Sequence, residues 1–186
     1  MKKISTLKRL ALVICGVIVT LYLSNASFLA RPIGPQPLLV AHRGVDQNIA
    51  RTGLTNASCT ATRLLPTPHD YLANTIASMR AAFAYGADVV ELDIHPTTDG
   101  HFAVFHDWTI DCRTNGSGVT REQTLARLQS LDIGYGYTAD GGKTYPFRGQ
   151  GVSLMPSLED VFTAFPTHKL IINVKSNDLQ EGERLA

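Results

Sequence analysis

Four short groups of residues in this chain of 186 residues combine side chains that can do acid–base, phosphate-binding and metal-binding chemistry. Each group lies at or near the C-terminal end of an apolar, β-like run, and in chain order they are His42-Arg43-Gly44, Glu91-Leu92-Asp93, His106-Asp107 and Asn173-Val174-Lys175. Parallel α/β barrels hold their active sites at that end of the strands. The placement therefore predicts that the four groups meet in one site.

The residue types suit cleavage of a phosphodiester beside a metal ion. Glu91 and Asp93 are two positions apart, so on a strand both carboxylates face the same side and can share one divalent cation. An imidazole titrates near neutral pH, so one of His42 and His106 can take a proton from a nucleophile while the other gives one to the leaving oxygen. Arg43 offers a planar guanidinium for a phosphate group.

Three neighbouring residues have narrower predicted roles. Lys175 adds a second cation for the phosphate. We interpret Asp107 as a residue that orients the His106 loop rather than as a metal ligand. His95 shares the strand parity of the two carboxylates, and two interpretations stay open for it, a ligand or simply the end of the strand.

In order and spacing these groups resemble the glycerophosphodiester phosphodiesterase family. The resemblance runs from about residue 38 to the end of the chain and includes the flanking text "GADVVELDIHPTTDGHFAVFHD" and "LMPSLEDVF". It implies an α/β fold, a TIM (β/α)₈ barrel. It also implies hydrolysis of a small glycerophosphodiester to glycerol 3-phosphate and an alcohol, in phospholipid metabolism.

The same resemblance assigns roles to the residues. It implies one Mg²⁺ or Ca²⁺ ion held by Glu91 and Asp93, with Asn173 at the position of a third ligand. It implies that His42 and His106 form the acid and base pair. Which histidine is the acid stays open.

The chain departs from the family pattern at two positions. Ala73 stands where the family usually has Glu before Asn-Thr, so a carboxylate near the mouth of the site is missing, and whether that carboxylate orients Arg43 stays open. Asn173 stands where the family commonly has a Glu ligand. An amide oxygen is neutral and binds a hard cation more weakly, so we expect looser metal binding.

Two alternative functions stay open from the sequence. Related phospholipases share the barrel and a similar histidine pair, so a lipid phosphodiester is the second substrate class. The second alternative is a catalytically inactive binding protein or a fragment, which the two departures favour.

The length predicts part of a barrel, because a (β/α)₈ barrel typically needs about 250 residues. We predict strands at 38–41, 88–94, 101–105 and 169–174, which make about the first four β/α units. A fragment or a truncated reading frame would explain this count.

The first residues have the composition of an export signal. Lys2, Lys3, Lys8 and Arg9 precede an uncharged apolar run over 10–23. Residues 1–31 are therefore predicted to be either a signal peptide or an N-terminal membrane anchor, followed by a Pro-rich spacer at 32–37 and the partial barrel domain at 38–186. We expect an exported protein of the cell envelope, membrane-anchored or periplasmic or extracellular.

Charge and cysteine positions add two further expectations. Without the four N-terminal cations the chain has 13 basic against 16 acidic residues, so a nucleic-acid partner is not indicated. Cys59 and Cys112 follow the first and third predicted strands and so lie on one face of the barrel. A disulfide between them and two free thiols both stay open.

The remaining segments are predicted as helices and two loops over the site. A helix is expected from residue 74 or 75 to a stop at Gly86, a second after a capping box at Thr120 to Gln123, and a third from Ser157. The third helix is expected to bury Leu158, Val161, Phe162 and Phe165. The loop at 45–73 is interpreted as a lid or a substrate-binding loop. For 132–151 two interpretations stay open, a second loop over the site and a solvated insertion with scattered charge.

Overall fold

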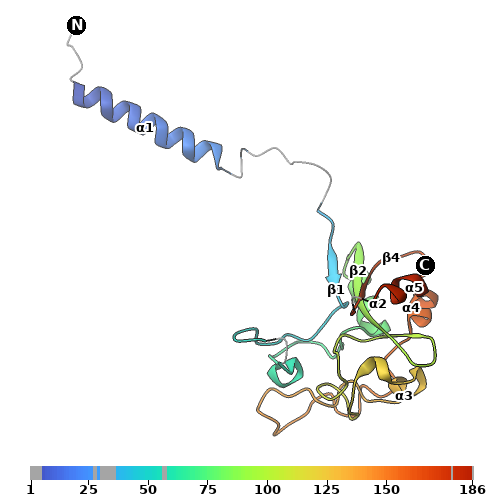
Figure 1. Cartoon of the computed structure of the whole chain (residues 1–186). Coiled ribbons are helices and arrows are strands. Elements are labelled where there is room, and N and C mark those ends of the chain that lie inside the picture. Colours follow the sequence, from blue (N-terminus) through green and yellow to red (C-terminus); the bar gives the residue numbers. More distant parts are fainter. Residues whose placement is uncertain (1–5, 27–28, 30–36, 56–57, 177, 186) are drawn as a thin grey trace. The chain divides into compact units, whose positions relative to one another are not determined.

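A computed structural model of the chain describes residues 6–26, 29, 37–55, 58–176 and 178–185 (Figure 1). The chain divides into two units, Met1–Pro37 and Leu38–Ala186, and each is described by itself. Apart from Pro37, the predicted spacer at 32–37 lies outside the described residues.

The first unit contains one helix, α1 (Thr6–Ser24), which includes the uncharged apolar run. The side-chain amide of Asn25 donates to the carbonyl of Leu21 at 2.8 Å and so satisfies a carbonyl in the last turn of α1. Among the described residues, no helix is long and apolar enough to cross a membrane.

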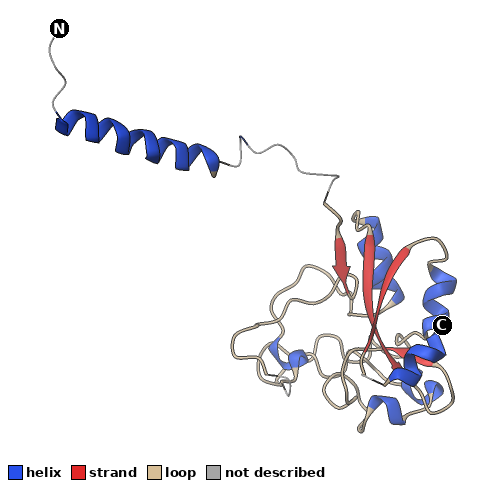
Figure 2. Ribbon diagram, turned by 45° about the horizontal axis from the view of Figure 1, so that its top comes forward, coloured by secondary structure: helices blue, strands red, loops and turns tan. Residues whose placement is uncertain are grey.

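The second unit is built on a sheet with three parallel strands, β1 (Val40–His42), β2 (Val89–Pro96) and β4 (Lys169–Val174) (Figure 2). Val89 pairs with Val40 of β1 and with Lys169 of β4, so β2 lies between the other two strands. The register places His42 opposite Glu91. It places Asp93 opposite Asn173. The predicted site residues of β1, β2 and β4 therefore lie together at the C-terminal ends of these strands.

The third predicted strand is not a barrel strand. β3 (Phe102–Val104) pairs antiparallel with the end of β2, where Ile94 lies opposite Val104. The connection after Pro96 is only a short turn containing Gly100, and parallel strands need a crossover of about a dozen residues or more. The prediction of four parallel units is therefore wrong for this segment, and the described sheet has three parallel strands and one hairpin strand.

Two helices cover the face of β2 that points away from the site. They are α2 (Ile76–Ala84), which begins after the capping residue Thr75, and α4 (Leu158–Ala164), which begins after Ser157. Their apolar residues pack on β2 in one core, whose fully buried members include Met79, Val90, Leu92, Ile94 and Val161. Phe162 is an exception to the sequence prediction, because it lies on the outer side of α4 and is 48% exposed. The last helix is α5 (Leu179–Leu185).

The second predicted helix begins later than its apparent capping box. Residues Thr120–Glu122 form a short 3₁₀ turn, η3, and α3 (Leu125–Gln129) begins after Thr124, whose hydroxyl accepts from the Arg127 amide. Thr120 instead donates its hydroxyl to the Asp107 carbonyl at 2.8 Å. The residue therefore supports a loop of the site rather than a helix end.

The two long segments predicted as loops over the site contribute to a second core, which they share with residues of β3 and α3. The first contains a 3₁₀ turn, η2 (Thr60–Arg63), and the second is folded around Asp132, whose carboxylate accepts backbone amides of Gly134, Gly149 and Gly151. Buried residues from both segments form one cluster, including Ala61, Leu64, Leu72, Ile133, Tyr137 and Phe147. The segment at 45–73 is therefore anchored in the fold by its buried residues Ala61, Leu64 and Leu72, while 51–55 are exposed.

Candidate active site

The turn after β1 packs tightly against the start of α2. Gly44 has φ +78°, and a Cβ there would lie 2.6 Å from the Ser78 carbonyl carbon, so only glycine fits without a shift. The Arg43 carbonyl accepts from the Ser78 hydroxyl at 3.1 Å and from the Asn74 amide at 3.0 Å. This turn gives Arg43 a left-handed backbone, φ 62°, and directs the chain away from the end of the strand.

Asp93 is the centre of the site and is fully buried. Its Oδ2 lies 2.9 Å from Arg43 Nε, in an ion pair without hydrogen-bond alignment, and its Oδ1 lies 3.5 Å from Lys175 Nζ. Two amides also donate to it, Asn74 Nδ2 at 3.1 Å and Asn173 Nδ2 at 3.0 Å. Two cations and two amides thus compensate a carboxylate whose burial would otherwise be costly.

Glu91 differs from Asp93 in having no such compensation. Its Oε2 is buried and makes no hydrogen bond, and the imidazole nitrogen Nε2 of His42 lies 3.8 Å from it. A carboxylate oxygen without a hydrogen bond is the kind of oxygen donor that a hard cation prefers, and Asn173, opposite Asp93 on β4, adds an amide oxygen to the same end of the sheet. Within the described ranges, no group of three or more His, Cys, Asp or Glu residues is arranged to hold a metal ion. Glu91 is the carboxylate of this pair that has no cationic protein partner within hydrogen-bond distance, whereas Asp93 is already paired with Arg43 and Lys175.

The first histidine, His42, ends β1 and is open to solvent. Its side chain is 62% exposed, which leaves the imidazole accessible to a substrate. Its position opposite Glu91 follows from the parallel pairing of β1 and β2. This register confirms that His42 and Glu91 lie side by side at the C-terminal ends of two neighbouring strands, as the sequence predicts.

The second histidine, His106, returns to the same edge through the hairpin. β3 runs back from the tip, and the Phe105 amide donates to the Asp93 carbonyl at 3.0 Å, which brings His106 near the level of Asp93. The carbonyl of His106 is held by His95, whose Nε2 lies 3.3 Å away. Burial lowers the pKa of His95, although its bond to this carbonyl opposes the shift, so the ring is neutral and donates. His95 thus supports the histidine loop.

The ring of His106 is oriented by its neighbour Asp107. Nδ1 of His106 lies 2.7 Å from Asp107 Oδ1, and Arg113 Nε donates to the other carboxylate oxygen at 3.0 Å. Burial by itself raises the pKa of Asp107, but the hydrogen bond from His106 and the charge of Arg113 outweigh it and lower the pKa to about 2. An ionised Asp107 accepts a hydrogen bond from the Nδ1–H group of His106, so Nε2 is the nitrogen left free for proton transfer.

The structure brings together most of the residues singled out from sequence. Arg43, Asp93, Asn173 and Lys175 are in direct contact, and Glu91 lies beside His42. Asn74 was missed, although an Asn before a helix-capping Thr is a common signal for a left-handed residue, and here its φ is 61°. Arg113 was also missed, because nothing in the sequence shows that a loop arginine is buried.

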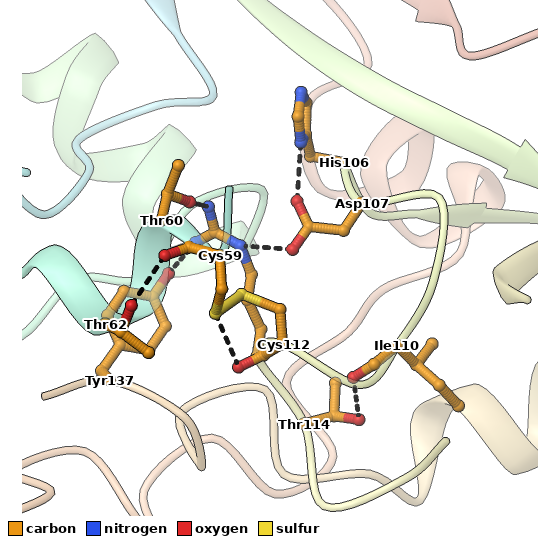
Figure 3. Close-up of a disulfide and its surroundings, with 10 residues drawn as sticks. Cys59, Thr60, Thr62, His106, Asp107, Ile110, Cys112, Thr114 and Tyr137 are labelled. Atoms are coloured by element: carbon orange, nitrogen blue, oxygen red, sulfur yellow. Dashed lines mark hydrogen bonds and ion pairs between the residues drawn. A yellow bond between two sulfur atoms is a disulfide. The ribbon is translucent and has the colours of Figure 1, made fainter. Parts of the chain in front are cut away.

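The sequence left open whether Cys59 and Cys112 pair, and the structure joins them by a disulfide with a Cα–Cα distance of 5.5 Å. The disulfide lies close to His106 and Asp107 (Figure 3). It links the segment after β1 to the segment after β3.

Comparison with known proteins identifies a related family. A family model described as the glycerophosphoryl diester phosphodiesterase family matches residues 42–184. A glycerophosphodiester phosphodiesterase of Caldanaerobacter subterraneus subsp. tengcongensis is 32% identical over 138 residues, which are 74% of this chain and 44% of that protein. One from Bacillus subtilis is 37% identical over 113 residues, 59% of this chain and 37% of that protein. The chain spans less than half the length of these curated relatives.

Solved structures have a similar fold. The glycerophosphoryl diester phosphodiesterase domain of the Mycobacterium tuberculosis protein Rv2277c has a TM-score of 0.57 at 23% identity and covers 81% of this chain and 48% of that one. An Oleispira antarctica phosphodiesterase, solved with the product sn-glycerol-3-phosphate, has a TM-score of 0.51 at 24% identity, with coverage of 80% and 49%. The likeness to these structures concerns the fold alone. Because the family model covers most of its length, this chain belongs to the glycerophosphoryl diester phosphodiesterase family.

Proposed function

We propose that the protein hydrolyses glycerophosphodiesters to glycerol 3-phosphate and an alcohol. The observation that carries this is the convergence of Arg43 and Lys175 on Asp93, at the sheet edge that also holds His42. Such an edge presents two cations to a phosphate and a histidine to its ester oxygens. The names of the relatives and the sn-glycerol-3-phosphate bound to one structural neighbour support the same substrate class.

The proposed chemistry assigns phosphate binding to the cations and proton transfer to the histidines. The ion pair of Arg43 with Asp93 is made by Nε, which leaves the terminal guanidinium nitrogens to donate to phosphate oxygens. One histidine takes the proton of the attacking group, either water or the neighbouring glycerol hydroxyl. The other gives a proton to the departing alkoxide as its bond to phosphorus breaks. His106 suits either role, since its Nε2 is free.

We also propose one divalent cation, Mg²⁺ or Ca²⁺, as the cofactor. Glu91, Asp93 and Asn173 would hold it, and the unpartnered Oε2 of Glu91 supports this choice. A bound cation would stabilise negative charge on the phosphate oxygens.

The sheet is proposed to form part of the barrel that the family resemblance implies. Support comes from the face that carries the site. Val40 and Ile171 share it with Glu91, by the registers of β1 and β4, and they are 47% and 46% exposed. In a closed barrel this face is the packed interior, which further strands would cover.

Export is proposed from the N-terminal composition and from the disulfide. Disulfides persist in oxidising compartments, which agrees with a signal-like run of Lys and Arg followed by an apolar segment. Fractionation of cells that produce the chain, with thiol labelling of Cys59 and Cys112, tests this. Recovery of the chain in the cytosol with both thiols free would contradict it.

The activity is tested by release of glycerol 3-phosphate from glycerophosphocholine, with Mg²⁺ or Ca²⁺ present. Alanine at His42 or His106 should lower the turnover about 10²- to 10⁴-fold, as expected for loss of a general acid or base. The matched control is His101→Ala, because His101 is an exposed histidine that pairs with Glu159. Unchanged turnover in both site variants would contradict the assignment, and absence of release by the wild-type chain would contradict the activity.

A further inference from the structure

Arg113 carries a buried charge in a part of the chain to which the proposed chemistry assigns no role. Its side chain is only 8% exposed, and a buried guanidinium must be paired. Three of its donors are satisfied: Nε by Asp107 at 3.0 Å, Nη2 by the Thr60 hydroxyl at 2.6 Å, and Nη1 by the hydroxyl of Tyr137. Within the described ranges, Asp107 is its one carboxylate partner.

Asp107 connects this charge to the histidine. One carboxylate oxygen faces His106 Nδ1 and the other faces Arg113 Nε, so the carboxylate cannot rotate without breaking one of the two bonds. The low pKa of Asp107 agrees with this double pairing. The direction of the His106 ring therefore depends on where Arg113 lies.

The disulfide fixes the two loops that meet at this arginine. Cys112 immediately precedes Arg113, and Cys59 immediately precedes Thr60. The hydroxyl of Thr60 accepts a hydrogen bond from Arg113. Figure 3 shows Thr60, the disulfide and the His106–Asp107 pair in one neighbourhood. The glycine at 136 completes the packing, since a Cβ there would meet the Cys112 carbonyl oxygen at 1.9 Å.

We propose that Arg113 is a positioning residue for His106, acting through Asp107, and that the Cys59–Cys112 disulfide holds Arg113 against Thr60. Arg113 touches neither substrate nor ion in this role. It keeps one tautomer of the histidine, with the proton on Nδ1 and Nε2 free. The part of this inference that concerns turnover rests on the proposed function, while the part that concerns the ring does not.

The ring is tested directly on the full chain by ¹H–¹⁵N correlation spectra of its histidine nitrogens. In the wild type we expect His106 to be protonated on Nδ1 alone when the ring is neutral. Arg113→Met keeps the aliphatic stem but removes the charge and the donors, so both tautomers should be populated. Arg113→Lys should give an intermediate spectrum. The matched control is Arg148→Met, because Arg148 is an exposed arginine that stacks on Tyr135 and Tyr145 and donates to the Tyr135 carbonyl.

Turnover gives a second readout. Arg113→Met should lower kcat about tenfold or more with KM unchanged, in the range seen when a group that orients a functional histidine is removed. If the wild type releases no glycerol 3-phosphate, the proposed function fails, and the tautomer measurement still decides the role of Arg113.

The disulfide is tested by the double variant Cys59→Ser, Cys112→Ser. We expect the same mixture of tautomers as in Arg113→Met, to a smaller extent. If Arg113→Met does not fold, Thr60→Val and Tyr137→Phe each remove one partner and should shift the ring in the same direction. A single, unchanged Nδ1–H tautomer in folded Arg113→Met, or in both of the milder variants, would overturn the proposal.

Discussion

Asn173 Nδ2 donates a hydrogen bond to Asp93 Oδ1 at 3.0 Å, across the pairing of β4 with β2. The amide thus stands at the position where the family resemblance implies a carboxylate ligand, and it contributes a donor where a carboxylate would add repulsion. Asp93 is already compensated by Arg43 and Lys175. With Asn173 at this position, Asp93 meets no second carboxylate from β4, and the proposed cation would have one charged ligand fewer.

Asn173→Glu should tighten divalent-ion binding by about tenfold, because affinity rises with the number of charged ligands. It should also lower stability in the absence of the ion, since two carboxylates would then face each other. Titration calorimetry with Mg²⁺ and Ca²⁺ measures the first effect and urea unfolding with a chelator the second. Asn173→Gln is the control, as it keeps a neutral amide. Equal affinity in wild type and Asn173→Glu would show that position 173 is not a ligand.

Arg43→Met should destabilise the fold by about 3 kcal/mol, the usual cost of leaving a buried charge with a missing partner. Arg43 and Asp93 are 14% and 0% exposed, so solvent screens the pair little. The double variant Arg43→Met, Asp93→Asn should recover much of this loss, because the charge is then absent. Urea unfolding of the two single variants and the double variant gives the coupling energy. Additive losses would contradict the pairing.

The Asp107 carboxylate should contribute a stability that depends on pH. Its pKa falls from 3.8 in the unfolded chain to about 2 in the fold. The contribution, about 2 kcal/mol, is therefore complete above about pH 4 and is lost as the pH falls toward 2. The wild type should have a higher free energy of unfolding than Asp107→Asn at neutral pH, and this difference should shrink as the pH falls from about 4 toward 2. Urea unfolding of both proteins at a series of pH values measures it. Glu183→Gln, at an exposed carboxylate, should leave the pH dependence unchanged.

Ala73→Glu should raise the turnover of glycerophosphocholine. Ala73 lines a small cavity with Asn74, His106 and Arg113, so a glutamate there would place a carboxylate beside the histidine. Ala73→Gln separates the charge from the size of the side chain. The release of glycerol 3-phosphate checks this, and equal rates for the Glu and Gln variants would show that the carboxylate has no role.

The sheet edge and its chemistry are largely readable from the sequence. Alternation of apolar and polar residues in 89–94 indicates which side chains share a face, and the register of β2 with β4 confirms that Asp93 lies opposite Asn173. Helix ends at Thr75 and Ser157 are confirmed because both have local capping hydrogen bonds. Local rules of this kind do not depend on the rest of the chain.

The errors arose where distant contacts decide. The strand predicted at 101–105 was counted among the parallel strands, whereas β3 pairs antiparallel with β2, as the short Thr-Thr-Asp-Gly connection before it indicates. The position of Arg113 depends on a disulfide partner that lies 53 residues away, and no local pattern reveals that its guanidinium is buried. Phe162 was expected in the core, but the side of α4 that faces β2 is already filled by Leu158, Val161 and Phe165.

The bond between Asn173 and Asp93 joins residues 80 positions apart, whereas the hairpin of β2 and β3 closes within a short stretch of chain. Short closures cost less chain entropy, so the hairpin can form before β4 docks. Until β4 docks, Asp93 lacks both Asn173 and Lys175. A slip of β4 by one residue would turn both side chains to the other face of the sheet and leave the carboxylate undercompensated. The contacts of Asp93 with Asn173 and Lys175 thus also select the register in which β4 pairs with β2. An apolar strand pair would not distinguish the registers in this way.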